Sequence, residues 1–293
     1  MHPNIVILAG GVASRMKKSA LASGTPDADV GRDAEDLPKG MICVSDEGRP
    51  FLDYLLYNIE QSGYRNVVIV IGERDTTIRS RYEEQHSDIL VQQLNISFVV
   101  QKIPAGKHKP LGTADALLEA LKVKPEWKHQ KFTVCNSDNL YSVQALRSLL
   151  ADKHDNALID YDRSALKVDE SRIAQYAVMR KDAEGFLEDI VEKPSTDEII
   201  RAADTSGRIG VSMNIFRFSY ESIYPFLETV PLHPVRQEKE LSIAVKMMIA
   251  QYCKSIFTIP LSEHVPDLTV QSDIADVKKY IEHEFQKHRF SRQ

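Results

Sequence analysis

The stretch NIVILAGGVASRM, residues 4–16, decides the fold of this chain. Its first six residues predict a buried strand, and this strand leads directly into Gly10 and Gly11. A strand that ends in adjacent glycines lets backbone N–H groups approach a ligand closely, and Arg15 adds a cation that suits phosphate. The stretch is therefore a candidate phosphate-binding loop. Its spacing matches neither G-x-G-x-x-G nor G-x-x-x-x-G-K-S/T, which excludes the dinucleotide-binding and Walker motifs.

Beyond this strand, short apolar runs alternate with amphipathic stretches, as expected when helices cover both faces of a mostly parallel sheet. The pattern predicts an α/β fold. In the first half we expect parallel strands over residues 4–9, 66–72, 96–101 and 131–135, and helices over 51–62, 76–84 and 113–122. After Asp138 we expect a mixed sheet, with strands over 157–161, 177–181, 186–192 and 209–217 and helices over 240–251 and 273–287.

The organisation of the chain is simple. No linker rich in Pro, Gly or Ser divides it, so we expect one domain over residues 1–293, with functional halves at 1–140 and 141–293. The segment from Ser19 to Leu37 is rich in small and acidic residues and lacks hydrophobic periodicity, which predicts a surface loop.

The composition is that of a globular protein, with 293 residues, 43% of them hydrophobic and 27% charged. Against 42 Asp and Glu residues stand 37 Lys and Arg residues, and the net charge of −5 argues against charge-driven nucleic-acid binding. The apolar runs are far shorter than the roughly 20 residues that span a bilayer, and the N-terminus lacks a basic leader. We therefore expect a cytoplasmic protein that binds neither nucleic acid nor membrane.

The three cysteines, Cys43, Cys135 and Cys253, are scattered and have no C-x-x-C spacing. This argues against a disulfide framework or a zinc site and predicts reduced thiols in the core. Homo-oligomerisation stays open, because surface patches cannot be identified from the sequence.

Five motifs in order along the chain carry a family resemblance. They are Leu8 to Met16, Pro38-Lys39, Gly112 to Ala116, Asn136 to Asn139, and Glu192 to Pro194. Together they resemble the signature elements of the sugar-1-phosphate nucleotidyltransferases, also called NDP-sugar pyrophosphorylases. The resemblance implies a Rossmann-like three-layer α/β/α fold with a mixed, mostly parallel sheet. It also implies that the first half binds the nucleotide and the second half the sugar phosphate.

The implied nucleotide site combines the glycine loop with two later segments, and its residues are Leu8, Ala9, Gly10, Gly11, Gln101, Gly112 and Thr113. By resemblance, Gln101 faces the base. Its amide offers a donor and an acceptor, as the edge of uracil or thymine requires, which favours UTP or dTTP. The Gly112 to Ala116 element is also similar to that of adenylyl- and guanylyltransferases, so the base stays open. Taken singly, Thr113 also fits a helix N-cap and Gln101 an exposed strand end.

Charged residues complete the implied catalytic site. Arg15 and Lys39 would neutralise the triphosphate as pyrophosphate leaves. Asp138 ends an apolar strand, where α/β sheets place ligand-facing groups, and its hard carboxylate suits Mg²⁺, although it could instead cap the following helix. By resemblance Asp267 is the second Mg²⁺ ligand. Asp273 competes with it for this role, and we expect Asp273 to cap the last helix.

The implied sugar site lies in the second half of the chain. Glu192 would accept hydrogen bonds from sugar hydroxyls, and Lys193 would hold the sugar-1-phosphate next to the α-phosphate. Ala177 stands where the family usually has glycine, which changes the clearance for the sugar. The segment from Glu238 to Leu241 resembles a helix start of the family and is interpreted as structural.

The resemblance implies a Mg²⁺-dependent enzyme that converts an NTP and a sugar-1-phosphate into an NDP-sugar and pyrophosphate. One alternative is a CTP-dependent transferase for another phosphomonoester such as phosphocholine. A second is a non-catalytic regulatory protein that keeps the fold and binds nucleotide sugars. A related metal-dependent glycosyltransferase would need a D-x-D motif at the strand end, where this chain has the single carboxylate of Asp138.

Overall fold

The computed structural model of the chain describes residues 2–11, 37–83 and 91–285. In these ranges one sheet has the strand order β3-β2-β1-β4-β9-β5-β8-β6-β7, and β10 pairs with β5. The strands are β1 (Asn4–Leu8), β2 (Asn66–Gly72), β3 (Asn95–Gln101), β4 (Lys131–Asn136), β5 (Ala157–Asp162), β6 (Val178–Lys181), β7 (Leu187–Val191), β8 (Gly210–Val211), β9 (Phe216–Ser219) and β10 (Phe257–Leu261).

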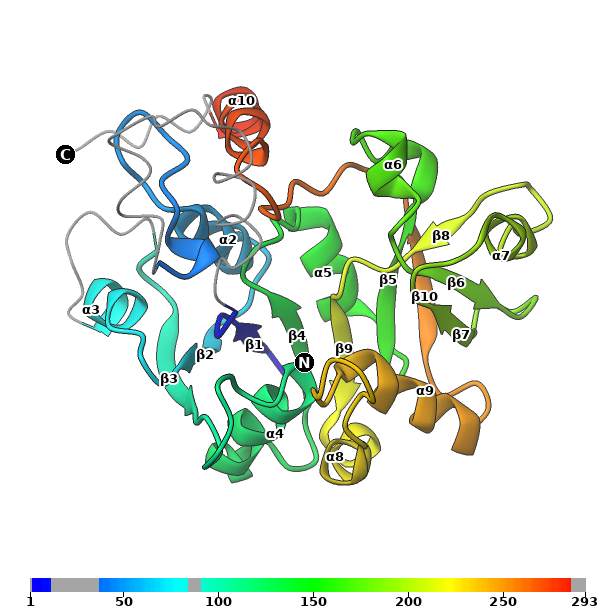
Figure 1. Cartoon of the computed structure of the whole chain (residues 1–293), viewed down its shortest axis with the longest axis horizontal. Coiled ribbons are helices and arrows are strands. Elements are labelled where there is room, and N and C mark those ends of the chain that lie inside the picture. Colours follow the sequence, from blue (N-terminus) through cyan, green and yellow to red (C-terminus); the bar gives the residue numbers. More distant parts are fainter. Residues whose placement is uncertain (1, 12–36, 84–90, 286–293) are drawn as a thin grey trace.

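Helices cover both faces of this sheet (Figure 1). One face packs against α2 (Phe51–Gln61), α5 (Val143–Ala151) and α10 (Asp273–Phe285). The other face packs against α4 (Thr113–Val123), α8 (Tyr220–Thr229) and α9 (Leu241–Gln251). Shorter helices are α3 (Thr77–Glu83), α6 (Glu170–Ile173) and α7 (Thr196–Arg201). The arrangement confirms the expected α/β fold with helices on both sides of a central sheet.

The two halves of the sheet differ in strand direction, as expected. β1 pairs in parallel with β2 and β4, and β2 pairs in parallel with β3, so the four strands expected in the first half are confirmed. β9 then runs antiparallel to β4 and β5, and β6 runs antiparallel to β7. The sheet is therefore mixed beyond β4.

The single strand expected over residues 209–217 is wrong. The structure has two strands there, β8 and β9, which both pair with β5 but differ in their second partner, β6 for β8 and β4 for β9. Asn214 lies between them with a φ of 56°, in the left-handed region that an extended strand cannot contain. The sequence pattern does not predict β10 and α8, which carry Pro260 and Pro225 in positions where proline usually argues against a strand or helix.

The cysteines agree with the expectation only in part. Cys135 is a buried free thiol, but Cys43 and Cys253 are exposed, so only one of the three lies in the core.

The expected loop from Ser19 to Leu37 lies outside the described residues except for Leu37. None of the helices within the described ranges is long and apolar enough to cross a membrane.

A chain of side-chain amides fixes the register of the parallel strands at their amino-terminal ends. Asn95 donates to Asn66, Asn66 donates to Asn4, and Asn4 donates to Gln130, with donor–acceptor distances of 3.2, 2.9 and 2.8 Å. In the ladder Asn4 is directly opposite Asn66, and Asn66 is opposite Asn95. A shift of one residue in any of these strands would break the chain of hydrogen bonds.

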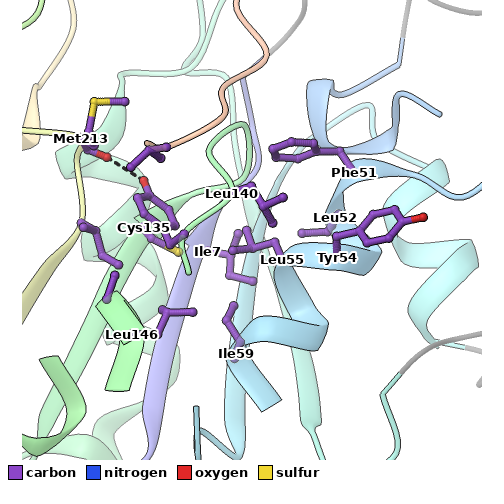
Figure 2. Packing of buried hydrophobic residues seen from close by; sticks show 14 of the residues in the cluster. Ile7, Phe51, Leu52, Tyr54, Leu55, Ile59, Cys135, Leu140, Leu146 and Met213 are labelled. Carbon is purple, nitrogen blue, oxygen red and sulfur yellow. Dashed lines mark hydrogen bonds between the residues drawn. The ribbon is translucent and has the colours of Figure 1, made fainter. Parts of the chain in front are cut away.

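The core between β1, β4 and α2 supports the carboxyl ends of the strands. Figure 2 shows Ile7 of β1 beside Cys135 of β4 and Leu55 of α2, and all three side chains are fully buried. At the edge of this cluster, the Tyr141 hydroxyl donates to the Met213 carbonyl oxygen at 2.7 Å, the bond drawn as a dashed line (Figure 2). This bond ties the segment after β4 to the segment between β8 and β9.

We expect Tyr141→Phe to lower the free energy of unfolding by about 1–2 kcal/mol, because the Met213 carbonyl would stay buried without this donor. Burial raises the pKa of Tyr141 well above its usual value, so its hydroxyl keeps the proton that it donates. Urea unfolding at neutral pH measures the change. Tyr252→Phe, at a side chain on the surface, is the control and should change stability by less than about 0.5 kcal/mol. Equal effects of the two substitutions would contradict the prediction.

Candidate active site

The glycine loop begins where β1 ends, between β2 and β4. The Ala9 N–H donates to the Val70 carbonyl oxygen at 2.8 Å, and the Leu8 carbonyl oxygen accepts from the Ser137 N–H at 3.2 Å. Leu8 and Ala9 are buried, whereas Gly10 is half-buried and Gly11 is exposed. The chain therefore emerges from the sheet at the two glycines, as a ligand-binding loop requires. Arg15 lies outside the described residues.

Lys39 and Asp138 meet at the end of β4. The Lys39 Nζ lies 2.7 Å from Asp138 Oδ2, and the side chain of Asp138 keeps 26% of its surface exposed. A Cβ on Gly40 would lie 3.3 Å from the Ser137 carbonyl oxygen, a tight contact that glycine avoids. The alternative role of Asp138 as a helix cap is wrong, because Ser142 caps α5.

Asp267 is carried to the same place by backbone pairing. The Leu268 N–H donates to the Asp138 carbonyl oxygen at 2.9 Å, and the Leu140 N–H donates to the Pro266 carbonyl oxygen at 2.8 Å. These two bonds lay the segment around Asp267 alongside the segment that follows β4. The two carboxylates expected to hold a metal thus come from adjacent backbone segments, although 129 positions separate them in the sequence.

The carboxylate of Asp267 is already paired. Arg172 of α6 donates to its Oδ2 at 2.6 Å, the Thr269 hydroxyl donates to the same oxygen at 2.8 Å, and the Tyr176 hydroxyl lies 3.4 Å from Oδ1. Burial raises the pKa of Asp267, and the charge of Arg172 opposes this shift. Arg172 is a site residue that the sequence does not predict, because no local pattern indicates a partner 95 positions away.

Asp273 has a different role. Arg172 contacts it as well, and its Oδ2 accepts from the N–H groups of Thr269 and Val270 at 2.6 and 2.7 Å. Asp273 is the first residue of α10, and the two N–H groups that donate to it belong to residues before the helix. The expectation that Asp273 caps α10 is therefore wrong. It closes the turn that follows Asp267. With Arg172 and two backbone donors around it, Asp273 is a poorer metal ligand than Asp138.

The residues present fit a divalent cation in part. Asp138 offers a partly exposed carboxylate, whereas Arg172 and Thr269 hold the Oδ2 of Asp267 and leave its Oδ1 less engaged. Residues 2–11, 37–83 and 91–285 contain no group of three or more His, Cys, Asp or Glu side chains placed to hold a metal. A cation here would thus need further oxygen ligands, which phosphate groups and water can supply.

Gln101, Gly112 and Thr113 come together at the end of β3 and the start of α4. The Gln101 Nε2 donates to the Gly112 carbonyl oxygen at 2.9 Å and to Asp115 Oδ2 at 2.8 Å. Gln101 is only 3% exposed, so the alternative of an exposed strand end is wrong. Thr113 does not cap α4, because the N-cap is Gly112 and the Thr113 hydroxyl instead accepts from the Leu241 N–H at 2.9 Å.

The segment from Glu238 to Leu241 holds this turn in place, which confirms its interpretation as structural. The Ala114 N–H donates to the Lys239 carbonyl oxygen at 3.0 Å. Gly112 has a φ of 100°, and a Cβ there would lie 2.8 Å from the same carbonyl oxygen. Both the backbone conformation and the close contact therefore require glycine at this position.

The residues expected to bind the sugar also gather at one place. Val178 of β6 is opposite both Val191 of β7 and Val211 of β8, so Ala177 lies next to Glu192 across the hairpin. The Ala177 carbonyl oxygen accepts from the Ser212 N–H at 3.0 Å. Tyr176, directly before Ala177, approaches Asp267, so the sugar residues adjoin the carboxylates.

Lys193 follows Glu192 in an unusual backbone conformation. Its φ of 48° lies in the left-handed region, which residues other than glycine and asparagine rarely adopt. Such conformations cost about 1–3 kcal/mol and concentrate at sites that bind ligands. Lys254 shares this conformation, so the role of Lys193 rests on its place beside Glu192.

Comparison with known sequences places this arrangement in a family. A sequence model described as nucleotidyl transferase matches residues 34–257, which is well over half of the chain. The chain therefore belongs to the nucleotidyl transferase family, and the resemblance to sugar-1-phosphate nucleotidyltransferases is confirmed.

Curated relatives are distant and longer. A glucose-1-phosphate adenylyltransferase of Koribacter versatilis is 22% identical over 224 residues, which cover 76% of this chain and 49% of the relative. The bifunctional protein GlmU of Staphylococcus epidermidis is 25% identical over 232 residues, which cover 78% of this chain and 42% of the relative. The chain thus matches less than half the length of either relative.

Solved structures share the fold across nearly the whole chain. HddC from Yersinia pseudotuberculosis superposes with a TM-score of 0.62 at 19% identity, covering 96% of this chain and all of that one. A UDP-glucose pyrophosphorylase complexed with UDP-glucose superposes with a TM-score of 0.67 at 17% identity, covering 99% of this chain and all of that one. These similarities confirm the fold.

We expect Gly112→Ala to destabilise the protein by about 3 kcal/mol, because it combines a left-handed backbone conformation with a close contact to Lys239. It should also displace Gln101 and weaken nucleotide binding. Urea unfolding and calorimetric nucleotide titration measure the two effects.

Gly106→Ala is the matched control. Gly106 also has a positive φ, of 78°, but a Cβ there would meet nothing within 4 Å. This substitution should cost about 1 kcal/mol and leave nucleotide binding unchanged. Indistinguishable effects of the two alanines would show that the contact with Lys239 does not matter.

Proposed function

We propose that this protein transfers a nucleotidyl group from an NTP to a sugar-1-phosphate and releases pyrophosphate. One observation carries the proposal: backbone pairing lays Asp267 alongside Asp138, next to Lys39 and the end of β1. The sugar residues adjoin this cluster through Tyr176 and Ala177. Phosphate-binding, charge-bearing and hydroxyl-binding groups therefore follow one another along one edge of the sheet.

The reaction needs little proton chemistry, because the attacking sugar phosphate is already an anion. Its oxygen attacks the α-phosphorus in line with the departing pyrophosphate. Lys193 holds the attacking phosphate, while Arg15 and Lys39 stabilise the negative charge on the leaving group. Glu192 accepts hydrogen bonds from the sugar hydroxyls, and Ala177 sets the clearance beside the ring. Positioning and charge neutralisation thus supply the catalysis.

Asp138 and Asp267 would hold the divalent cation, which we propose to be Mg²⁺. When bound, the cation supplies positive charge to the α-phosphate and to the leaving pyrophosphate. Lys39 already lies on Asp138 and Arg172 on Asp267, so these two cations balance the carboxylates while no metal is bound. Both side chains can then turn to phosphate oxygens when the carboxylates take up the cation.

The division of labour follows the strand directions. The parallel half, residues 1–140, carries the glycine loop, Gln101 and Gly112, and we assign the nucleotide to it. The mixed half, residues 141–293, carries Ala177, Glu192 and Lys193, and we assign the sugar phosphate to it. The sequence favours UTP or dTTP because Gln101 could offer a donor and an acceptor, but both of its N–H groups have partners within the protein.

Pyrophosphate release tests the proposed activity. The assay crosses ATP, CTP, GTP, UTP and dTTP with the 1-phosphates of glucose, N-acetylglucosamine, galactose and mannose, and with phosphocholine, in the presence of Mg²⁺. We expect one productive pair that contains a sugar phosphate. Asp138→Asn should lower its kcat on the order of a hundredfold, because a charge on the metal site is lost. Nucleotide binding without turnover in every combination would favour the non-catalytic alternative, and turnover only with CTP and phosphocholine the other.

A second prediction concerns the acceptor. We expect Lys193→Gln to raise the KM for the sugar phosphate by about tenfold or more, because a charge-assisted hydrogen bond is lost. The KM for the NTP should change little. Lys254→Gln is the matched control, since Lys254 is also a lysine with a positive φ, of 56°, but pairs with Glu184 away from the site. A rise in the NTP KM alone would contradict the assignment.

A further inference from the structure

A cavity of about 910 Å³ opens at the edge of the sheet opposite to the candidate active site. It is lined by residues 153–156, by α8 and by the second half of α9, and both helices lie in the lower half of the view in Figure 1. Lys131 begins β4 and donates to carbonyl oxygens of this lining, whereas Asp138 follows the other end of the same strand. A strand of six residues is roughly 20 Å long, so the cavity is remote from the candidate active site.

Aromatic rings form one wall of this cavity. His154 and Phe186 line it, and Phe257 lies behind them. The rings of His154 and Phe257 are stacked, with centroids 4.0 Å apart and an interplanar angle of 16°. Phe186 is 5.6 Å from His154 and 5.5 Å from Phe257, so it flanks the stack instead of covering it. The outer face of the His154 ring therefore stays open, and 41% of this side chain is exposed.

The ring of His154 is held in a fixed position. Its Nδ1 lies 3.0 Å from Asp152 Oδ1, and its backbone N–H donates to the same oxygen at 2.8 Å. The Lys131 Nζ donates to the carbonyl oxygens of Lys153 and His154 at 3.1 and 2.7 Å. The exposed ring is thus a preformed platform for stacking, as is usual in sites that bind small molecules.

Lys153 carries the unpaired charge of this cavity. It is exposed, and its ammonium group pairs with no carboxylate within residues 2–11, 37–83 and 91–285. The other charged residues of the lining have partners in the protein: Asp155 pairs with Lys131, Glu221 with His129, and Lys254 with Glu184. A free cation directly beside the platform favours a ligand with a negative charge.

Apolar groups make up much of the remaining lining. Phe226 and Tyr252 meet edge to face with ring centroids 6.1 Å apart, and Met248 is fully buried. The hydroxyl of Ser255 is buried and has no hydrogen-bond partner among the described residues. A polar atom of a ligand could satisfy this hydroxyl once it turns about the Cα–Cβ bond. The cavity thus combines apolar surface with a few polar groups, which is the composition of a small-molecule site.

We propose that this cavity is a second ligand site, which takes a flat aromatic or heteroaromatic ring that carries an anionic group. The ring stacks on the outer face of His154, and the anionic group pairs with Lys153. Nucleoside monophosphates and aromatic carboxylates share this chemistry. The inference does not rest on the proposed function, because none of these residues belongs to the candidate active site.

The dye 8-anilinonaphthalene-1-sulfonate is the probe for this site, since it combines fused aromatic rings with an anionic group. Fluorescence titration of the 293-residue chain measures its Kd. We expect His154→Ala to raise this Kd about tenfold through the loss of stacking, and Lys153→Gln about fivefold through the loss of the charge. Lys153 is exposed, so its substitution leaves the fold intact.

Matched controls lie on α10, where His283 and Lys279 form exposed ion pairs with neighbouring carboxylates. His283→Ala and Lys279→Gln should keep the wild-type Kd. Lys39→Gln removes a cation from the candidate active site and should keep it as well. A weaker affinity in Lys39→Gln would place the dye in the candidate active site and overturn the proposal.

Displacement of the dye distinguishes the two sources of ligand. The competitors are AMP, 4-hydroxybenzoate, adenosine, which lacks the anionic group, and ribose 5-phosphate, which lacks the aromatic ring. We expect AMP or 4-hydroxybenzoate to displace the dye at concentrations about tenfold lower than adenosine and ribose 5-phosphate require. Displacement by AMP alone indicates a nucleotide ligand, and displacement by 4-hydroxybenzoate alone indicates an aromatic carboxylate.

Three results would overturn the proposal: no displaceable dye on the wild-type protein, an unchanged Kd in both His154→Ala and Lys153→Gln, or adenosine as effective as AMP and 4-hydroxybenzoate. None of these measurements requires turnover. The absence of pyrophosphate release would therefore contradict the proposed function alone.

Discussion

The candidate site depends on one piece of backbone pairing. Two hydrogen bonds, from Leu268 to Asp138 and from Leu140 to Pro266, join the segment before α10 to the segment after β4. These two bonds hold Asp267 near Asp138. The donor and acceptor groups are backbone atoms, so the pairing does not depend on the identity of the neighbouring side chains. In Figure 1 the segment that joins β10 to α10 runs from β10 at the right of the view back past α5 to α10 at the upper left.

The negative charges of Asp138 and Asp267 lie in adjacent segments, and cationic side chains of the protein balance them. Lys39 lies on Asp138, and Arg172 lies on Asp267 and Asp273. A buried carboxylate left without a counter-charge would be strongly destabilising, so these pairs keep the edge of the sheet stable when nothing is bound. The same pairs place two cations at the proposed phosphate site. In the proposed reaction, the side chains that stabilise the carboxylates would also bind the anion.

Structural features that depend on residues close together in the sequence could be predicted. The parallel strands β1 to β4 are short and mostly apolar, and Asp138 follows one of them closely, so both could be anticipated. Contacts made over long sequence distances could not. Arg172 meets Asp267 across 95 positions, and no local pattern indicates that pairing. Asn214 takes a left-handed conformation, which asparagine adopts more readily than most residues, and this splits an otherwise convincing strand.

Gln101 shows why the chemistry of a residue cannot be derived from its type alone. A free amide offers donors and an acceptor, but a nearly buried amide must satisfy its N–H groups within the protein, since leaving them unpaired costs about 1–3 kcal/mol. The groups satisfied in this way are no longer available to a ligand. What the residue recognises is therefore decided by the atom that the fold leaves without a partner. In Gln101 these N–H groups are held by Gly112 and Asp115, which lie fourteen residues or fewer from Gln101 and outside β3.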